Sequence, residues 1–406
     1  MSPLAAAGIS ASSYACRHAW EQRQLGEVVS ASGIKNREQK DLQSYSISNQ
    51  SGFIPQSEQF DNGGKPLDAD KSSYWIVAPH SFAYNPARIN VGSIGYWNGE
   101  KPVIVSSLYE VFQTHESVDD SFLSDWFRTR LFTNQIAKRQ EGGVRQYFFF
   151  DKLQESRIRL PSLPEQRRIG EFFSALDSLI AAAERQEALL KQKKQAYLQL
   201  MFPQEGETRP RLRFNGFSGE WESLQLGKLY EKNTERNGNQ FDAGKTLSVS
   251  SMTFNAFGNG AAEESLTTYK VLRIGDAAFE GHTSNEFAFG RFVVNTIGDG
   301  IMSPRFTAIR PTARWRQSCD LDFWSCYLHD ENVMKRILVR STKRGTMMNE
   351  LVLDDFFTER IRVPSLPEQR HIGKFFSTLE SLIAAAEERT KHLRELKGSY
   401  LQRMFV

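Results

Sequence analysis

The sequence RIRLPSLPEQRRIGEFFSALDSLIAAAE, at Arg157–Glu184, is nearly repeated as RIRVPSLPEQRHIGKFFSTLESLIAAAE at Arg360–Glu387. A shift of 203 positions aligns residues 157–202 with 360–405 without a gap, and about 30 of the 46 aligned residues are identical. The beginnings of the two halves are also similar, whereas their middles diverge: WEQRQLGEV starts at Trp20 and WESLQLGKL at Trp221. The chain is therefore an internal duplication whose halves share a common end.

The repeated segment has the pattern of a long helix. Ser162 and Glu165 form a capping-box motif, and Pro164 falls in the first turn, where its missing N–H costs nothing. The second copy repeats this motif with Ser365, Pro367 and Glu368. The residues from Leu163 to Met201 would form a rod of about 55 Å at about 1.5 Å per residue.

Apolar residues recur along each copy at heptad spacing, which predicts that the two helices pack on each other as a coiled coil. We expect the packing residues to be Ile169, Phe172, Leu176, Leu179, Leu190 and Tyr197 in the first copy, and Ile372, Phe375, Leu379, Leu382, Leu393 and Tyr400 in the second. In the first copy, Ile169, Leu176, Leu190 and Tyr197 belong to a first row, and Phe172, Leu179 and Leu200 form a second row. Phe173, Ile180 and Met201 lie beside the second row. With a domain attached to each helix, the expected arrangement is antiparallel and pseudo-twofold. The alternative is that each helix belongs to the core of its own domain.

Length and composition favour a folded protein with at least two domains. The chain has 406 residues, 40% hydrophobic residues and a formal net charge of +3, so its charge does not by itself indicate a nucleic-acid binder. Cys16, Cys319 and Cys326 are too few for a disulfide framework, which suits a reducing compartment. No apolar run reaches the length of a membrane helix. We therefore expect a cytoplasmic protein.

The divergent middles combine short strands with amphipathic helices. SYWIVA, KPVIVSSLYEVF, RFVVN and RFTAIRP predict strands, and Asp120–Arg139 and Asp320–Arg340 predict one helix each. The predicted fold class is thus α+β, with two α/β domains joined by two long helices. The expected boundaries are an N-terminal tail at 1–15, a first domain at 16–160, a helix at 161–202, a linker at 203–219, a second domain at 220–362 and a helix at 363–406.

Basic residues cluster late in each middle, beside Gly, Asn, Gln and aromatic residues, which are typical of surfaces that contact phosphates and bases. No catalytic constellation accompanies them. YNPAR (Tyr84–Arg88) departs from the catalytic loop of amino-methyltransferases at Ala87 and Arg88, and PLDADK (Pro66–Lys71) resembles a nuclease motif only over a short stretch. Cys319, Cys326 and His329 lack zinc-ligand spacing. We predict no metal site and no enzyme activity for this chain.

The order of variable domain, LPSLPEQRRIGEFFSALDSLI helix, variable domain and VPSLPEQRHIGKFFSTLESLI helix resembles the specificity subunit of Type I restriction-modification enzymes. FNGFSGEWE before the second domain, the loop FAYNPARINVGSIG and the turn EGGVRQ (Glu141–Gln146) are also similar. The resemblance covers nearly the whole chain from Trp20 onward, whereas residues 1–15 have no counterpart in the repeat.

The resemblance implies a non-catalytic reader of double-stranded DNA. Each variable domain would be a target recognition domain for one half of a split sequence, and the helix pair would be a ruler and a dock for two methyltransferase subunits. Those partners would carry S-adenosylmethionine, and the restriction/translocase subunits that join them would use ATP and Mg²⁺. Half-sites about one turn apart, roughly 10 bp, suit a pseudo-twofold reader. The DNA-contact candidates are Tyr84, Asn85, Arg88, Arg145, Gln146, Arg291, Arg305, Lys343 and Arg344.

Two alternatives remain open at this point. The same scaffold could serve a Type IIG-like system in which one polypeptide carries the methyltransferase and the nuclease. It could also be a coiled-coil interaction scaffold without DNA binding, which would show no salt-dependent affinity for DNA.

Overall fold

The computed structural model describes residues 20–49, 51–59, 70–142, 146–255, 257, 260, 262–346 and 348–405. The chain divides into two compact units. The first unit comprises the described residues up to Ala183 together with those from Arg389 onward, and the second comprises Glu184–Glu388. Each long helix contributes one part to each unit. The expected tail at 1–15 and Cys16 lie outside the described residues.

The first unit is built on a four-stranded sheet, a five-stranded sheet and a two-stranded ribbon. Their orders are β2-β10-β7-β8, β3-β6-β9-β4-β5 and β1-β11. The strands are β1 (Glu21–Gln24), β2 (Val29–Ala31), β3 (Ile34–Lys35), β4 (Ser44–Ser48), β5 (Gly52–Pro55), β6 (Trp75–Val77), β7 (Ser81–Tyr84), β8 (Ile94–Trp97), β9 (Val103–Val105), β10 (Glu110–Thr114) and β11 (Arg157–Leu160). The short helices are η2 (Leu25–Glu27), α2 (Gln56–Gln59), η3 (Ile89–Val91), α3 (Asp120–Trp126), α4 (Arg130–Arg139) and α5 (Phe150–Gln154).

The second unit has a similar topology, with a four-stranded sheet in place of the five-stranded one. Its strand orders are β13-β20-β17-β18, β15-β14-β19-β16 and β12-β23, and it adds the pair β21-β22. The strands are β12 (Glu222–Gln225), β13 (Tyr230–Lys232), β14 (Thr246–Ser248), β15 (Thr253–Asn255), β16 (Lys270–Leu272), β17 (Ala277–Glu280), β18 (Arg291–Val294), β19 (Gly300–Met302), β20 (Thr307–Pro311), β21 (Thr342–Lys343), β22 (Glu350–Leu351) and β23 (Arg360–Val363). The short helices are α7 (Leu226–Leu229), η4 (Ala243–Lys245), η5 (Glu263–Thr268), α8 (Ala313–Arg316), α9 (Leu321–His329), α10 (Glu331–Ser341) and α11 (Leu353–Thr358).

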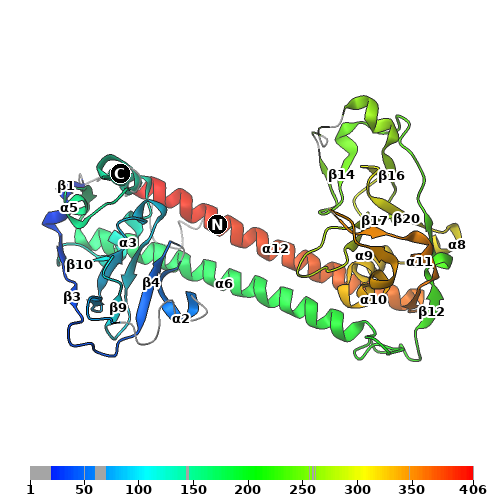
Figure 1. The fold of residues 1–406 in the computed structure, drawn as a ribbon, viewed down its shortest axis with the longest axis horizontal. Coiled ribbons are helices and arrows are strands. Elements are labelled where there is room, and N and C mark those ends of the chain that lie inside the picture. The colour runs from blue at the N-terminus through cyan, green and yellow to red at the C-terminus, as the bar shows by residue number, and fades with distance from the viewer. Residues whose placement is uncertain are drawn as a thin grey trace. The chain divides into compact units, whose positions relative to one another are not determined.

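The two units match at the level of strand register. Each has one parallel strand pair in its outer sheet, β4 with β9 and β14 with β19. In the second unit, Figure 1 shows the sheet of β14 and β16 extending away from α12 beyond the sheet of β17 and β20. The four runs expected to be strands are strands in the structure. The α+β fold class and the internal duplication are therefore confirmed.

The two helices expected at Asp120–Arg139 and Asp320–Arg340 are each broken in two, so this expectation was wrong. In the first unit α3 ends at Trp126, and the hydroxyl of Thr129 accepts a hydrogen bond from the N–H of Phe132 to start α4. In the second, Asp330 accepts from the N–H of Val333 to start α10. A capping side chain in mid-segment allows a new helix axis at the same point of each half.

The long helices are α6 (Leu163–Met201) and α12 (Leu366–Met404). Glu165, expected in a capping box, instead accepts a hydrogen bond from the indole N–H of Trp20 at 3.2 Å. Glu368 is fully buried and accepts from Trp221 at 3.4 Å and from two guanidinium nitrogens of Arg213 at 2.6 and 2.7 Å. The repeated glutamate therefore fastens the first strand of each domain, or the segment before it, to the start of its helix.

The helices pack antiparallel in both units. In the first, the ring of Phe172 near the start of α6 lies 5.2 Å from that of Tyr400 near the end of α12. In the second, the rings of Phe375 and Tyr197 lie 5.0 Å apart, with the helix ends exchanged. Ion pairs repeat in the same sense: Lys397 pairs with Asp177, and Lys194 pairs with Glu380.

The buried seam differs from the predicted one in its second row. Leu179 and Leu382 are 51% and 52% exposed, so their expected packing between the helices is corrected. The second row is formed instead by Phe173, Ile180, Phe376 and Ile383, all buried. Of the other predicted residues, Ile169, Leu176, Ile372 and Leu379 are buried, and Phe172, Leu190, Tyr197, Phe375, Leu393 and Tyr400 are partly buried.

Candidate nucleic-acid interface

A β-hairpin in the first unit carries three of the predicted DNA contacts. β7 and β8 pair with Tyr84 opposite Ile94, and residues 85–93 form the loop between them. The Asn85 side-chain oxygen accepts a hydrogen bond from the N–H of Ala87 at 3.0 Å, which shapes the start of the loop. Arg88 is exposed. The loop therefore presents a guanidinium and a partly exposed amide to solvent.

Tyr84 itself lies in the core. Its side chain is 0% exposed and its ring packs edge-on against Phe112 at 6.2 Å, while its hydroxyl has no hydrogen-bond partner among the described residues. Burial raises the pKa of Tyr84 above its ordinary value. A side chain in this position stabilises the sheet and does not reach a ligand in this conformation.

The matching hairpin of the second unit is braced by charge. Glu280 and Arg291 are paired across the hairpin, at the position where Asn85 and Ser93 are paired in the first unit. The Arg291 guanidinium binds the Glu280 carboxylate at 2.8 Å and the Ser250 carbonyl oxygen at 3.0 Å, and it lies over the ring of Phe287. These three contacts occupy Arg291, whose predicted base contact stays a prediction.

The first unit makes an equivalent link with a neutral group. The Ser93 hydroxyl is buried and donates to the carbonyl oxygen of Ile47, which lies in β4, at 2.8 Å. Ser250 follows β14, the counterpart of β4. Sequence reasoning missed Ser93, Glu280 and Ser250 as anchors of the two hairpins. The sequence signal that could have revealed the ion pair is the opposite charge of Glu280, at the end of AAFE, and Arg291, at the start of RFVV.

The remaining candidates occupy exposed positions. Gln146, Arg305, Lys343 and Arg344 are exposed, and the Arg305 guanidinium lies 4.9 Å from the centre of the Phe306 ring. Arg145 lies outside the described residues, as do two other residues of the six-residue turn that it was predicted to form. Lys343 and Arg344 sit at and directly after the short strand β21. These side chains are free to reach phosphate or base edges, which exposed cations and amides can do.

Several arginines of the predicted basic clusters form ion pairs within the chain. Arg310 binds Asp276 at 2.7 Å and Glu235 at 2.8 Å, and the Asp276 carboxylate raises the pKa of Arg310. Arg340 is paired with Glu359 and Arg336 with Glu205. Sequence spacing does not show which arginines of these clusters are engaged in ion pairs within the chain.

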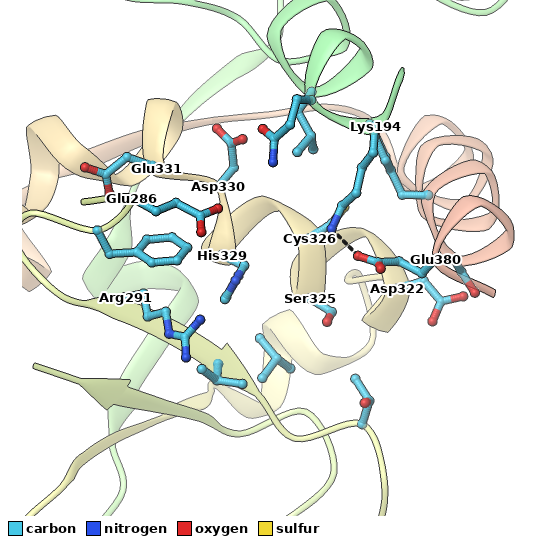
Figure 2. A pocket seen from close by; sticks show the side chains of 18 of the residues that line it. Lys194, Glu286, Arg291, Asp322, Ser325, Cys326, His329, Asp330, Glu331 and Glu380 are labelled. Carbon is cyan, nitrogen blue, oxygen red and sulfur yellow. Dashed lines mark ion pairs between the residues drawn. The ribbon is translucent and has the colours of Figure 1, made fainter. Parts of the chain in front are cut away.

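A cavity of about 730 Å³ opens in the second unit between α6, β18, α9 and α12 (Figure 2). Lys194 and Glu380 form an ion pair at one side, and His329 lies in the middle. Burial raises the pKa of Asp330 to about 6 and lowers the pKa of His329. The lining carboxylates are Glu286, Asp322, Asp330, Glu331 and Glu380. Since they outnumber the cations that line it, the cavity is a poor receptor for a phosphate backbone.

The described residues offer no arrangement of three or more His, Cys, Asp or Glu side chains that could hold a metal ion. Cys326 and His329, whose sequence spacing does not suit a zinc site, lie on α9 at the cavity. Within the same described ranges, none of the helices is long and apolar enough to cross a membrane.

Comparisons with known proteins identify this architecture. Residues 18–192 match the family described as Type I restriction modification DNA specificity domain. A chain from a type I R-M system, described with its complex assembly and conformational transition, aligns at a TM-score of 0.54 and 17% identity over 95% of this chain and 97% of that chain. The S subunit of a Type-I restriction-modification system from M. genitalium aligns at a TM-score of 0.55 and 11% identity over 97% and 98%. Curated protein sequences gave no match.

Two β-rich domains with two long helices packed together define the fold class of S subunits. Residues 18–192 of this chain are therefore similar to the specificity domain of Type I restriction-modification enzymes, and the chain shares the fold of the two solved structures.

Proposed function

We propose that this chain recognises a split double-stranded DNA sequence, with each unit acting as a target recognition domain for one half. The observation that carries the proposal is the matched pair of frameworks. Both units fasten their domain to a long helix through the same Trp–Glu contact, whereas the hairpins beside them differ in chemistry. A repeated framework that carries two different hairpins suits a protein that recognises two different targets.

The exposed candidates supply the chemistry for such recognition. Arg88, Arg305 and Arg344 could pair with guanine or phosphate, and Gln146 with adenine. Lys343 would contact phosphate, which positions a protein without reading sequence. The domain boundaries stated above from the sequence belong to this proposal, and so does the role of the helix pair as a ruler.

We further propose that two methyltransferase subunits dock on the long helices and bring restriction/translocase subunits with them, in the cytoplasm. Leu179 and Leu382 support this assignment, because they expose apolar surface at the same position of each helix. Exposed apolar side chains on a helix suit a partner helix laid against it. S-adenosylmethionine, ATP and Mg²⁺ would be bound by those partners.

The test is co-expression of the chain with the methyltransferase subunit of its system, followed by mapping of methylated adenines by long-read sequencing. We expect a split motif with two defined halves around an unspecified spacer. A continuous motif would contradict recognition by two units.

The variant Arg344→Ala assigns a half-site to the second unit. It should weaken or relax only one half of the motif, by about 1–3 kcal/mol if the side chain reads a base. Arg336→Ala, which removes an exposed arginine already paired with Glu205, is the control and should leave both halves unchanged. Loss of assembly with the methyltransferase in Arg344→Ala would place this residue at a subunit interface instead.

A further inference from the structure

The turn before β7 holds a histidine in a conformation that its counterpart leaves to glycine. His80 has φ +60°, and Gly275, before β17, has φ +89°. The two residues are equivalent, because His80 N–H donates to the carbonyl oxygen of Trp97 and Gly275 N–H to that of Asn295, both at 2.9 Å. A left-handed backbone costs free energy for any residue with a Cβ. The first unit therefore keeps an unfavourable residue where the second has a favourable one.

The His80 side chain begins a chain of hydrogen bonds. Its Nδ1 lies 2.8 Å from the Tyr96 hydroxyl, which donates to Asp120 Oδ2 at 2.7 Å. The Thr114 hydroxyl donates to the other oxygen of Asp120. Because the single proton of the Tyr96 hydroxyl goes to Asp120, His80 Nδ1 is the donor to Tyr96. The four residues thus form one continuous chain, in which the donors on both sides converge on the Asp120 carboxylate.

The second unit builds the same elements without this chain. Strand register and helix position match His80, Tyr96, Thr114 and Asp120 with Gly275, Val294, Pro311 and Leu321, in that order. None of these four has a side chain that can form a hydrogen bond. Since the turn, the hairpin and the helix all form without it, the fold does not require the chain.

The chain connects the hairpin of the first unit to a long helix. Tyr96 lies in β8, directly beyond the loop that carries Asn85 and Arg88. Asp120 is the first residue of α3, and the N–H of the preceding Asp119 donates to Gln166 of α6 at 2.9 Å. The second unit braces its hairpin elsewhere, through the Arg291 ion pair. A stretch of 22 residues (Asn98–Asp119) separates β8 from α3 along the chain, and the Tyr96–Asp120 hydrogen bond links the two elements directly.

We propose that His80 is a positioning residue for DNA recognition by the first unit. Through Tyr96 and Asp120 it fixes the hairpin loop of residues 85–93 relative to α3 and α6. The cost of its backbone conformation is retained because recognition requires the loop in one orientation. The inference rests on the proposed function, since it presumes that the first unit recognises one half of a split target.

The test uses the full chain in complex with its methyltransferase subunit. His80→Gly installs the residue of the second unit, so the turn remains compatible with folding. Tyr96→Phe removes one hydroxyl and keeps the ring. For each variant, methylation rates are measured on DNA with the correct target and on DNA with single-base changes in each half-site. We expect discrimination at one half-site to fall on the order of fivefold in both variants, as the loss of one hydrogen bond allows, while discrimination at the other half-site is unchanged.

Tyr45→Phe is the matched control, because its hydroxyl reaches only the exposed Gln43 side chain. A thermal melt of His80→Gly should show a midpoint no lower than that of the wild type. The double variant His80→Gly/Tyr96→Phe should be no worse than either single variant if the chain acts as one unit. Variants that discriminate as the wild type does, or that lose both half-sites equally, would overturn the inference. A wild-type complex that methylates no split motif would overturn the proposed function and, with it, this inference.

Discussion

The two units use the same strand topology but different chemistry at three matched positions between their sheets. The first unit has Ser81, Gln113 and Trp97 where the second has Asp276, Arg310 and Asn295. Trp97 packs against Tyr45 and Phe53 with tilted rings, at 4.9 and 5.3 Å between ring centres. The second unit instead buries a bidentate Arg310–Asp276 pair. Backbone pairing thus sets the topology, and the side chains at these positions are free to differ.

The largest effect should come from breaking the buried pair. Asp276→Ala leaves the Arg310 guanidinium partly buried with one carboxylate partner fewer, and truncating one member of such a pair costs about 3–5 kcal/mol. Ser81→Ala is the matched control, because the Ser81 hydroxyl is buried without a hydrogen-bond partner, and its removal should change the free energy of unfolding by less than about 0.5 kcal/mol. Urea denaturation measures both. Equal losses in the two variants would show that the difference in chemistry carries no difference in energy.

A second difference between the units is a buried carboxyl group in the first unit, which should make the free energy of unfolding depend on pH. Asp125 is buried on α3, and burial raises its pKa to about 7, although Arg128 lies 3.7 Å away. Because the folded-state pKa lies above the ordinary value of about 3.9, the folded state holds the proton more tightly. Stability is therefore highest below pH 4 for this group and falls as pH rises towards 7, by roughly 2–4 kcal/mol.

Asp125→Asn should remove this dependence between about pH 4 and pH 7, as measured by unfolding at a series of pH values. Its counterpart in the second unit is Cys326, which stays a neutral thiol because burial raises its pKa. Asp151→Asn, at an exposed carboxylate, is the control and should leave the pH profile unchanged. A profile that Asp125→Asn does not flatten would assign the titration to another group.

The smallest change in the free energy of unfolding is expected at Leu179 and Leu382, which lie at the same position in the two long helices. Leu179→Ser and Leu382→Ser replace exposed side chains, so each should change the free energy of unfolding by no more than about 0.5 kcal/mol. Ile180→Ala and Ile383→Ala, one residue further along, should each cost about 2–5 kcal/mol because they open cavities in the seam. A large loss in only one of the two leucine variants would show that the two helices present different faces.

Much of the fold was predictable because its signals are local. The helical period of the duplicated segment is visible over a few turns. The strand pattern of runs such as RFVV is visible over a few residues. The breaks at Thr129 and Asp330 were missed, since both capping residues lie inside apolar periodic segments. At the candidate interface, Arg88, Arg305 and Arg344 are exposed as a binding role needs, whereas Tyr84 proved to be core. All four residues of SFAY are buried in β7. The sequence pattern of this strand therefore did not show whether Tyr84 faces solvent or the core.

By itself, the sequence determined that this protein has two related halves, that each ends in a long amphipathic helix, and which family it resembles. Repeats and periods are properties of the order of residues along the chain. The tertiary structure decided which of two adjacent apolar rows forms the seam, because Phe172 and Phe173, like Leu179 and Ile180, satisfy the same spacing. It also decided which arginines are paired and which residues form the chain from His80 to Asp120. Those outcomes depend on atoms that meet across dozens to hundreds of residues, where spacing in the sequence carries no information about distance in space.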